Sequence, residues 1–190
     1  MKTTTRQLVL LLIALTLSSC NLVSDYGNTS ASDRDGYLKY SNKTLNISVL
    51  TPQEWKSQVT IGGEYVMRPV DSNDDSIAIA QSTAERMLGR EASEITTLEA
   101  FHHLQLSQIN EEIIGPELTV MDKKTSLSGH DAYQIFYSYR PKGMKHKLFT
   151  QITYTMLKGK IYLLSWYGLD ASRPHYRKEF EVIKSSYTIL

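Results

Sequence analysis

The sequence predicts an α+β fold in which an antiparallel β-sheet is flanked by helices. Three observations lead to this fold class. Four strand-like runs follow one another on short turns in the second half of the chain, which is typical of an antiparallel meander. These runs carry apolar side chains on both faces, as in a sheet that is covered on both sides. Two further segments have the apolar period of a helix.

The chain begins with a predicted export signal over residues 1–19. Lys2 and Arg6 form a short positive segment, and an uncharged apolar run from Leu8 to Leu17 follows. A helical run of this length reaches only about 15 Å, which is too short for a hydrocarbon core of about 30 Å. The run is instead typical of the central part of a signal peptide.

A lipoprotein processing site is predicted to end this signal. The run Leu17-Ser18-Ser19-Cys20 resembles a lipobox, in which small residues suit the protease and the cysteine thiol accepts lipid. The alternative is an ordinary signal peptide with an incidental cysteine. Because several acyl chains on one residue form a stable anchor, we expect Cys20 to hold the chain on a bacterial membrane, with the domain facing the periplasm or the exterior.

Composition narrows the classes of function. Cys20 is the only cysteine, so the remainder of the chain has no disulfide, no cysteine metal ligand and no thiol nucleophile. Removing Lys2 and Arg6 with the signal lowers the 21 basic residues to 19, against 20 acidic residues. A chain so close to neutral gives no support to nucleic-acid binding, which requires a clustered basic field.

The segment after Cys20 is predicted to be a tether. Residues 21–36 are rich in Ser, Asn, Asp and Gly and contain few apolar side chains. We therefore expect residues 20–36 to form a lipidated flexible tether with a reach of roughly 20–24 Å. A single folded domain is predicted over residues 37–190, a length that suffices to bury a core.

The first half of this domain is predicted to contain short strands. Alternating apolar residues over 45–49 indicate a half-buried strand that ends at Pro52. Trp55 follows it and is expected to pack over the edge of the sheet. A hairpin is predicted over residues 59–70 and a further strand over residues 76–80.

Two helices and the meander complete the prediction. Thr96 and Glu99 form a T-x-x-E capping box, which predicts a helix that ends near Ile114, before Gly115-Pro116. The meander is predicted over residues 118–127, 132–139, 148–157 and 161–167. A last helix follows Pro174, with one apolar stripe formed by Tyr176, Phe180, Ile183 and Tyr187.

Four motifs, in this order along the chain, resemble those of the PsbP-like family. They are Pro52-Gln53-Glu54-Trp55, Ser128-Gly129-His130-Asp131-Ala132-Tyr133, Gly159-Lys160-Ile161-Tyr162-Leu163-Leu164 and the closing run from Phe180 to Tyr187. The resemblance covers about Tyr37 to Leu190 and implies an αβα sandwich. The family contains the extrinsic photosystem II subunit and envelope lipoproteins such as the DcrB group. Most members are accessory or scaffolding proteins, so the resemblance implies that this chain is not an enzyme.

Three groups of residues imitate known sites. Residues 71–75 begin like a calcium loop, but serines stand where calcium requires a glycine turn and a bidentate carboxylate. His102 and His103 point about 100° apart on a helix, so they cannot chelate one metal together. We expect His102 to help cover the core and His103 to be solvated. Ser128-Gly129-His130-Asp131 contains the residue types of a catalytic triad, but neighbours in a turn cannot form its relay.

No catalytic residue, cofactor or metal site is therefore predicted, and the remaining candidate is basic. Arg140, Lys142, Lys145, His146 and Lys147 cluster around a turn. One interpretation is an ordinary charged hairpin tip. The other is a docking loop, formed by Arg140, Lys142, Lys145 and Lys147, for an acidic partner or anionic headgroups.

The sequence thus favours a membrane-tethered, non-catalytic binding or assembly lipoprotein that acts with an envelope protein complex. Two alternatives remain open. The first is an extrinsic subunit or assembly factor of photosystem II, because one fold can support several functions. The second is an envelope hydrolase with an unrecognised site, which would require a deep pocket with converging titratable groups.

Overall fold

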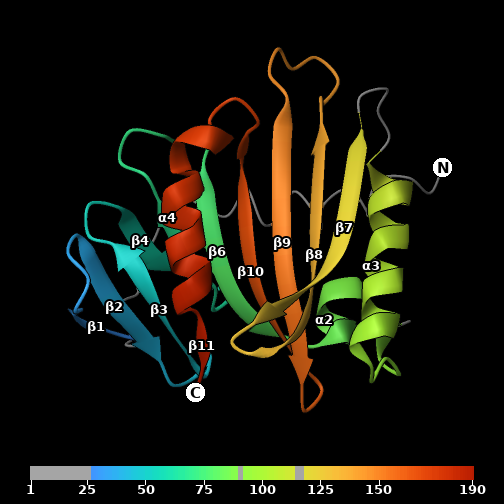
Figure 1. Cartoon of the computed structure of the whole chain (residues 1–190). Helices are drawn as coiled ribbons and strands as arrows, with labels where there is room; N and C mark the ends of the chain where they lie inside the picture. The colour runs from blue at the N-terminus through green and yellow to red at the C-terminus, as the bar shows by residue number, and fades with distance from the viewer. Residues whose placement is uncertain (1–26, 90–91, 114–117) are drawn as a thin grey trace.

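The computed structural model describes residues 27–89, 92–113 and 118–190, which form two antiparallel sheets and three helices (Figure 1). The small sheet has the strand order β1-β2-β3-β11, with β1 at Asn28–Ala31, β2 at Tyr37–Asn42, β3 at Ile47–Pro52 and β11 at Thr188–Ile189. The large sheet has the order β4-β5-β6-β10-β9-β8-β7. Its strands are β4 (Lys56–Val59), β5 (Tyr65–Arg68), β6 (Ser76–Ser82), β7 (Thr119–Leu127), β8 (His130–Tyr139), β9 (Leu148–Leu157) and β10 (Lys160–Leu169).

The predicted meander is confirmed as β7 to β10. Its two tight turns, Ser128-Gly129 and Lys158-Gly159, have positive φ at both residues. That backbone conformation is the type I′ turn, whose twist matches the twist of the strands that it joins. The register then places Leu127 opposite His130 and Leu157 opposite Lys160.

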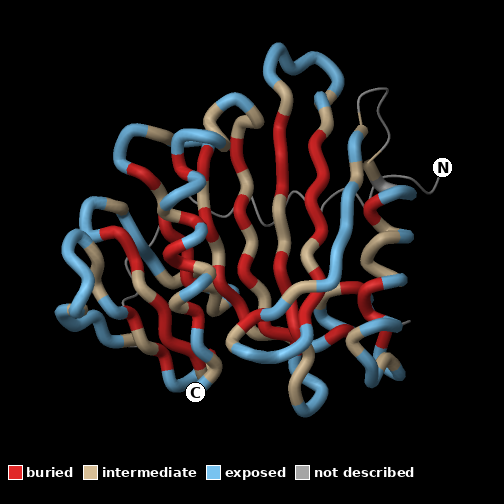
Figure 2. The backbone as a smooth tube through the Cα atoms, viewed as in Figure 1, coloured by how far each residue is buried: buried red, intermediate tan, exposed pale blue. Residues whose placement is uncertain are grey.

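The large sheet buries apolar side chains on both faces, as predicted. In β8, Ala132 and Phe136 belong to one core, while Tyr133, Ile135 and Tyr137 belong to the other. The first core is covered by α4 (Arg173–Ser186) and the small sheet, and the second by α2 (Ala84–Leu88) and α3 (Leu98–Glu112). Figure 2 shows long buried stretches in the middle strands of the large sheet. An antiparallel sheet flanked by helices is thereby confirmed.

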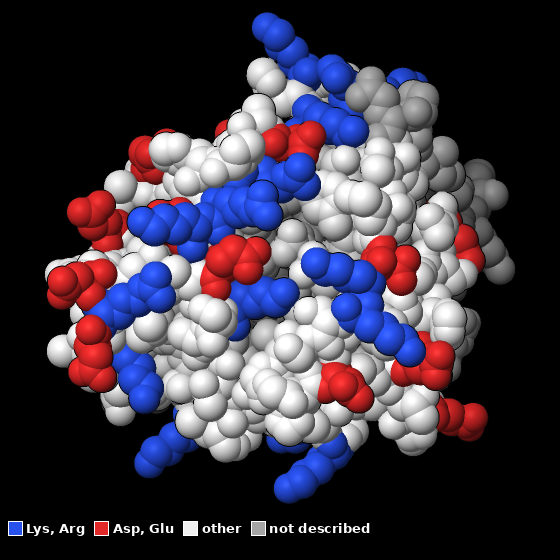
Figure 3. All heavy atoms as spheres, in the orientation of Figure 1, with Lys and Arg blue, Asp and Glu red and all other residues white. Residues whose placement is uncertain are grey.

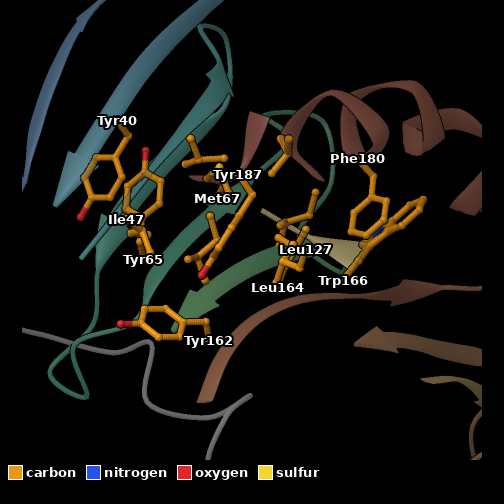
Figure 4. Close-up of a cluster of buried hydrophobic side chains, with 14 of the residues drawn as sticks. Tyr40, Ile47, Tyr65, Met67, Leu127, Tyr162, Leu164, Trp166, Phe180 and Tyr187 are labelled. Carbon is orange, nitrogen blue, oxygen red and sulfur yellow. The ribbon is translucent and has the colours of Figure 1, made fainter. Parts of the chain in front are cut away.

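The first core is centred on α4 and aromatic side chains (Figure 4). Phe180 stacks on Trp166 with 4.8 Å between ring centroids, and Trp166 meets Phe149 edge to face at 4.9 Å. Tyr40 of β2 stacks on Tyr65 of β5 and so joins the two sheets. The predicted apolar stripe of the last helix is confirmed, since all four of its residues are buried: Tyr176, Phe180, Ile183 and Tyr187.

The predicted tether and domain boundary are wrong in part. Asn28–Ala31 forms β1 and pairs with β2, so the described domain includes residues before Tyr37. All four residues of β1 are exposed. An edge strand of this kind is held by backbone hydrogen bonds and needs no apolar side chain, which is why composition did not indicate it. The predicted signal, Cys20 and the tether up to residue 26 lie outside the described residues.

Several predicted element ends also differ. The N-cap of α3 is Thr97, whose hydroxyl accepts a hydrogen bond from the amide of Ala100 at 3.2 Å, so the predicted Thr96–Glu99 capping box is wrong by one residue. The helix ends at Glu112, and the predicted stop at Ile114 and Gly115-Pro116 lies outside the described residues. The predicted hairpin over residues 59–70 exists, but it begins earlier than predicted. Its first strand is Lys56–Val59, which pairs with Tyr65–Arg68.

Trp55 is half-buried and meets Tyr176 edge to face at 5.8 Å, whereas Phe180 is fully buried in the same core. We expect Phe180→Ala to lower the free energy of unfolding by about 3–5 kcal/mol. Trp55→Ala should lower it clearly less, because part of this side chain already faces water. Denaturant unfolding of the two variants measures both values. Equal losses would contradict the ranking.

Candidate functional site

The loop between β8 and β9, residues 140–147, is called the basic loop from here on. It projects beyond the upper end of the large sheet (Figure 1). A β-turn closes it, in which the amide of Met144 donates to the carbonyl of Pro141 at 3.0 Å. Gly143 has φ 82° in this turn, a conformation that a glycine adopts without steric cost. At its base, the amide of Asp170 donates to the carbonyl of Lys147 at 2.9 Å. The loop therefore has a defined shape.

The four residues predicted to contact a partner have two different roles in this loop. The guanidinium of Arg140 donates to the carbonyl of Lys145 at 2.9 Å. This hydrogen bond connects the two sides of the loop. Lys142 and Lys145 are exposed and Lys147 is half-exposed. Among the described residues, no ion pair involves any of these three lysines. Figure 3 shows Lys and Arg side chains gathered at the upper end of the molecule.

A second loop at the same end, residues 71–75, carries acidic side chains. Asp75 is only 2% exposed, and its carboxylate accepts hydrogen bonds from Ser72 at 2.7 Å and Ser172 at 2.6 Å. A Cβ at Gly168 would overlap this carboxylate, so glycine is required where β10 passes it. The segment that imitates a calcium loop thus holds the start of α4. Within the described ranges, no group of three metal-ligating side chains is assembled.

Tyr176 ties the same loop to α4 from the other side. Its hydroxyl donates to the carboxylate of Asp71 at 2.9 Å. Burial and the negative charge of Asp71 raise the pKa of Tyr176 to about 12, so this phenol stays a hydrogen-bond donor at neutral pH. Asp71 and Asp74 remain exposed at the rim.

A second polar cluster inside the domain surrounds His102 of α3. One ring nitrogen, Nε2, lies 3.0 Å from the carboxylate of Asp122, and Nδ1 lies 2.8 Å from the hydroxyl of Tyr154. Tyr133 stacks on the ring at 3.8 Å. In a neutral histidine, Nε2–H donates to the carboxylate and Nδ1 accepts from the phenol. Every polar atom of the ring is therefore satisfied.

This Asp122–His102–Tyr154 chain has the residue order of a catalytic relay, but it ends inside the core. Tyr154 is fully buried, and burial raises the pKa of its phenol far above the ordinary value. A substrate cannot reach its oxygen. The cluster instead fixes α3 on the sheet. The prediction that His102 covers the core and His103 is exposed is confirmed.

Sequence reasoning did not identify the partners of His102. Asp122 and Tyr154 come from β7 and β9, far from α3 along the chain. The position of Asp122 could have been predicted. Strand alternation places it on the same face as Val120, which packs against the second core, below α3. No sequence pattern links Tyr154 to His102.

The residues with triad types do not form a triad. The hydroxyl of Ser128 accepts a hydrogen bond from the amide of Ile189 at 2.9 Å, and so ties the β7–β8 turn to β11. His130 and Asp131 are exposed at the start of β8.

Two hollows in the described surface are open and lined by polar as well as apolar side chains. One of about 560 Å³ lies on the small sheet and includes Asp33, Arg34 and Lys39, which are all exposed. The other, of about 230 Å³, lies beside β4 and β5 and includes Lys56 and Arg68. Neither contains a fully buried titratable side chain. In the described part of the chain, no helix is both long and apolar enough to cross a membrane.

Comparisons with known proteins identify the fold. No protein-family model and no curated protein matches the sequence. Cyanobacterial PsbP (CyanoP) from Synechocystis sp. PCC 6803 is similar in structure, with a TM-score of 0.54 and 13% identity over 92% of this chain and 99% of that chain. PA94 from Pseudomonas aeruginosa gives 0.50 and 11%, over 82% and 92%. LpqN from Mycobacterium tuberculosis, involved in cell envelope biogenesis, gives 0.49 and 18%, over 75% and 82%.

The similarity to CyanoP extends over almost the whole of both chains. It shows that this chain has a PsbP-like fold and confirms the fold that the four ordered motifs implied.

The His102 cluster predicts a pH dependence of stability. Burial lowers the pKa of His102 below its ordinary value of about 6.5, although Asp122 opposes this shift. Below about pH 6.5, His102 binds a proton more readily in the unfolded chain than in the folded chain. The free energy of unfolding should therefore fall as the pH decreases. Chemical unfolding of the wild type and His102→Gln at pH 7.5 and pH 5.5 tests this. The wild type should lose more stability than the variant, and identical losses would show that His102 is not responsible.

Proposed function

Taking the PsbP-like fold as premise, we propose that this chain is a non-catalytic binding or assembly module, tethered to a bacterial membrane of the cell envelope by lipid on Cys20. One observation carries the proposal. The polar clusters that could perform chemistry are used for contacts inside the domain, while the lysines of the basic loop face outward. The run from Leu17 to Cys20, with the charged and apolar segments before it, supports the tether.

The described residues give a hydrolase no support. Its site would need converging titratable groups in a cavity that a substrate can enter. The His102 chain ends at a buried phenol, and the carboxylate of Asp75 is surrounded by serine hydroxyls. The two open hollows are lined by exposed or partly exposed charges.

A role beside photosystem II is the second candidate. The similarity to a cyanobacterial PsbP favours it, because the two chains share the fold over almost their full length. Fold alone does not decide between the two roles. Occurrence of the gene in an organism without photosynthesis would exclude the second candidate.

The tether is tested by replacing Cys20. Cys20→Ser removes the thiol that accepts lipid, so a clickable fatty acid fed to the cells should label the wild type and leave the variant unlabelled. Labelling is measured on the purified chain, because an uncleaved precursor could stay on the membrane by its signal. Equal label on both chains would refute the lipid anchor.

The binding role is tested at the basic loop. Replacing Lys142, Lys145 and Lys147 with Ser should leave the melting temperature unchanged, because these side chains make no ion pair within the described residues. The same change should lower the capture of membrane partners at low salt, since exposed charges are screened beyond about 8–10 Å at physiological ionic strength. The control variant replaces three exposed lysines outside the loop: Lys43, Lys56 and Lys178. Equal capture by both variants would show that the basic loop is not a binding site.

A further inference from the structure

The chain enters the domain at the end opposite the basic loop. Asn28, the first residue of β1, lies opposite Ser41, close to the β2–β3 turn. The carbonyl of Leu45 in that turn accepts a hydrogen bond from Gln81 at 3.3 Å, and Gln81 pairs with Tyr162 beside the β9–β10 turn. In Figure 1 these turns and the C-terminus lie at the lower end, while the basic loop lies at the upper end.

The separation of these two ends follows from the length of β9. This strand runs from Leu148, at the base of the basic loop, to Leu157, at the lower turn. The nine steps between its ten residues span about 30 Å at a rise of about 3.3 Å each. The basic loop extends beyond that span.

The segment between the lipid and the domain is short by comparison. Residues 21–27 separate Cys20 from Asn28. Fully stretched, this segment reaches at most about 29 Å. A domain that turned its basic loop onto the headgroups would have to hold Asn28 some 30 Å above them. Only a fully stretched tether approaches that height, so the tether favours an orientation with the loop pointing away.

The charges of the upper rim distinguish a protein from a lipid surface. The lysines of the basic loop share this end with Asp71 and Asp74, which are exposed on the β5–β6 loop, on the far side of the β10–α4 connection. A uniformly anionic bilayer attracts the lysines but repels these two carboxylates. A protein surface can place acidic groups opposite the lysines and other groups opposite the aspartates, and such complementarity also fixes the register of a contact.

We infer that the basic loop, presented away from the anchoring membrane, docks an acidic face of a partner protein and not the headgroups of that membrane. The inference rests on the proposed lipidation of Cys20. Lys142, Lys145 and Lys147 supply the charge, and Met144, which is 55% exposed at the apex, supplies an apolar contact at the centre. Arg140 positions the loop through its hydrogen bond to the carbonyl of Lys145.

The orientation is tested on the lipidated chain in vesicles. The only native cysteine is Cys20, so a single cysteine introduced as Met144→Cys or Lys43→Cys can carry a fluorescent donor. The vesicles are phosphatidylcholine with an acceptor dye in the headgroup region. Energy transfer should be clearly weaker from residue 144 than from residue 43, which is exposed in the β2–β3 turn. Equal transfer, or the reverse order, would overturn the orientation.

The same vesicles distinguish a wrong orientation from a missing lipid anchor. If neither labelled chain sediments with neutral vesicles, the lipid on Cys20 is refuted, and the inference falls with the proposed function. Adding phosphatidylglycerol should leave the transfer from residue 144 unchanged. A rise with phosphatidylglycerol that is absent when Lys142, Lys145 and Lys147 are replaced by Ser would show that the loop binds headgroups, which overturns the inference.

The acidic partner is represented by labelled poly-L-glutamate. Its binding to the vesicle-bound chain at low salt should weaken about tenfold when the three loop lysines are replaced by Ser, because each exposed charge pair contributes a modest amount. The control with Lys43, Lys56 and Lys178 replaced removes the same charge elsewhere and should bind much as the wild type does. Equal weakening in both variants would overturn the assignment of the docking surface to the loop.

Discussion

The large sheet must be covered on both faces, and the rest of the structure follows from this constraint. Apolar residues alternate to the two sides of β8, so each side needs a layer that removes it from water. The side that contains Trp166 and Phe149 is closed by α4 and the small sheet. The other side is closed by α2 and α3. The chain is distributed over three layers for this reason, and its loops are left at the two ends of the sheet (Figure 1).

Covering both faces also brings polar groups inside, where each one requires a partner. His102 is enclosed by Tyr133, Tyr154 and Asp122, and Asp75 by serine hydroxyls. These residue types also occur in catalytic and metal sites, but here their contacts hold α3 and the start of α4 against the large sheet and its loops. Their polar atoms are engaged in contacts inside the domain, while Lys142 and Lys145 of the basic loop are exposed.

The parts of the fold that depend on local patterns were predictable, and those that depend on long-range pairing were not. Alternation and tight turns indicated β7 to β10, because register is set by neighbouring residues. The strand β1 was missed, since backbone pairing to β2 requires no apolar side chain. The partners of His102 were missed because folding alone brings three distant elements together. For the basic loop, composition indicated the positive charge, but only the structure separates Arg140, which closes the loop, from the outward lysines.

The last residues of the chain close the structure. Thr188–Ile189 completes the small sheet as β11, and the amide of Leu190 donates to the carbonyl of Asn46, whose side-chain amide donates back to Leu190. Directly before them, α4 covers the first core with Phe180 and Ile183. A nascent polypeptide can therefore complete neither the small sheet nor this core before residues 173–190 have been synthesised.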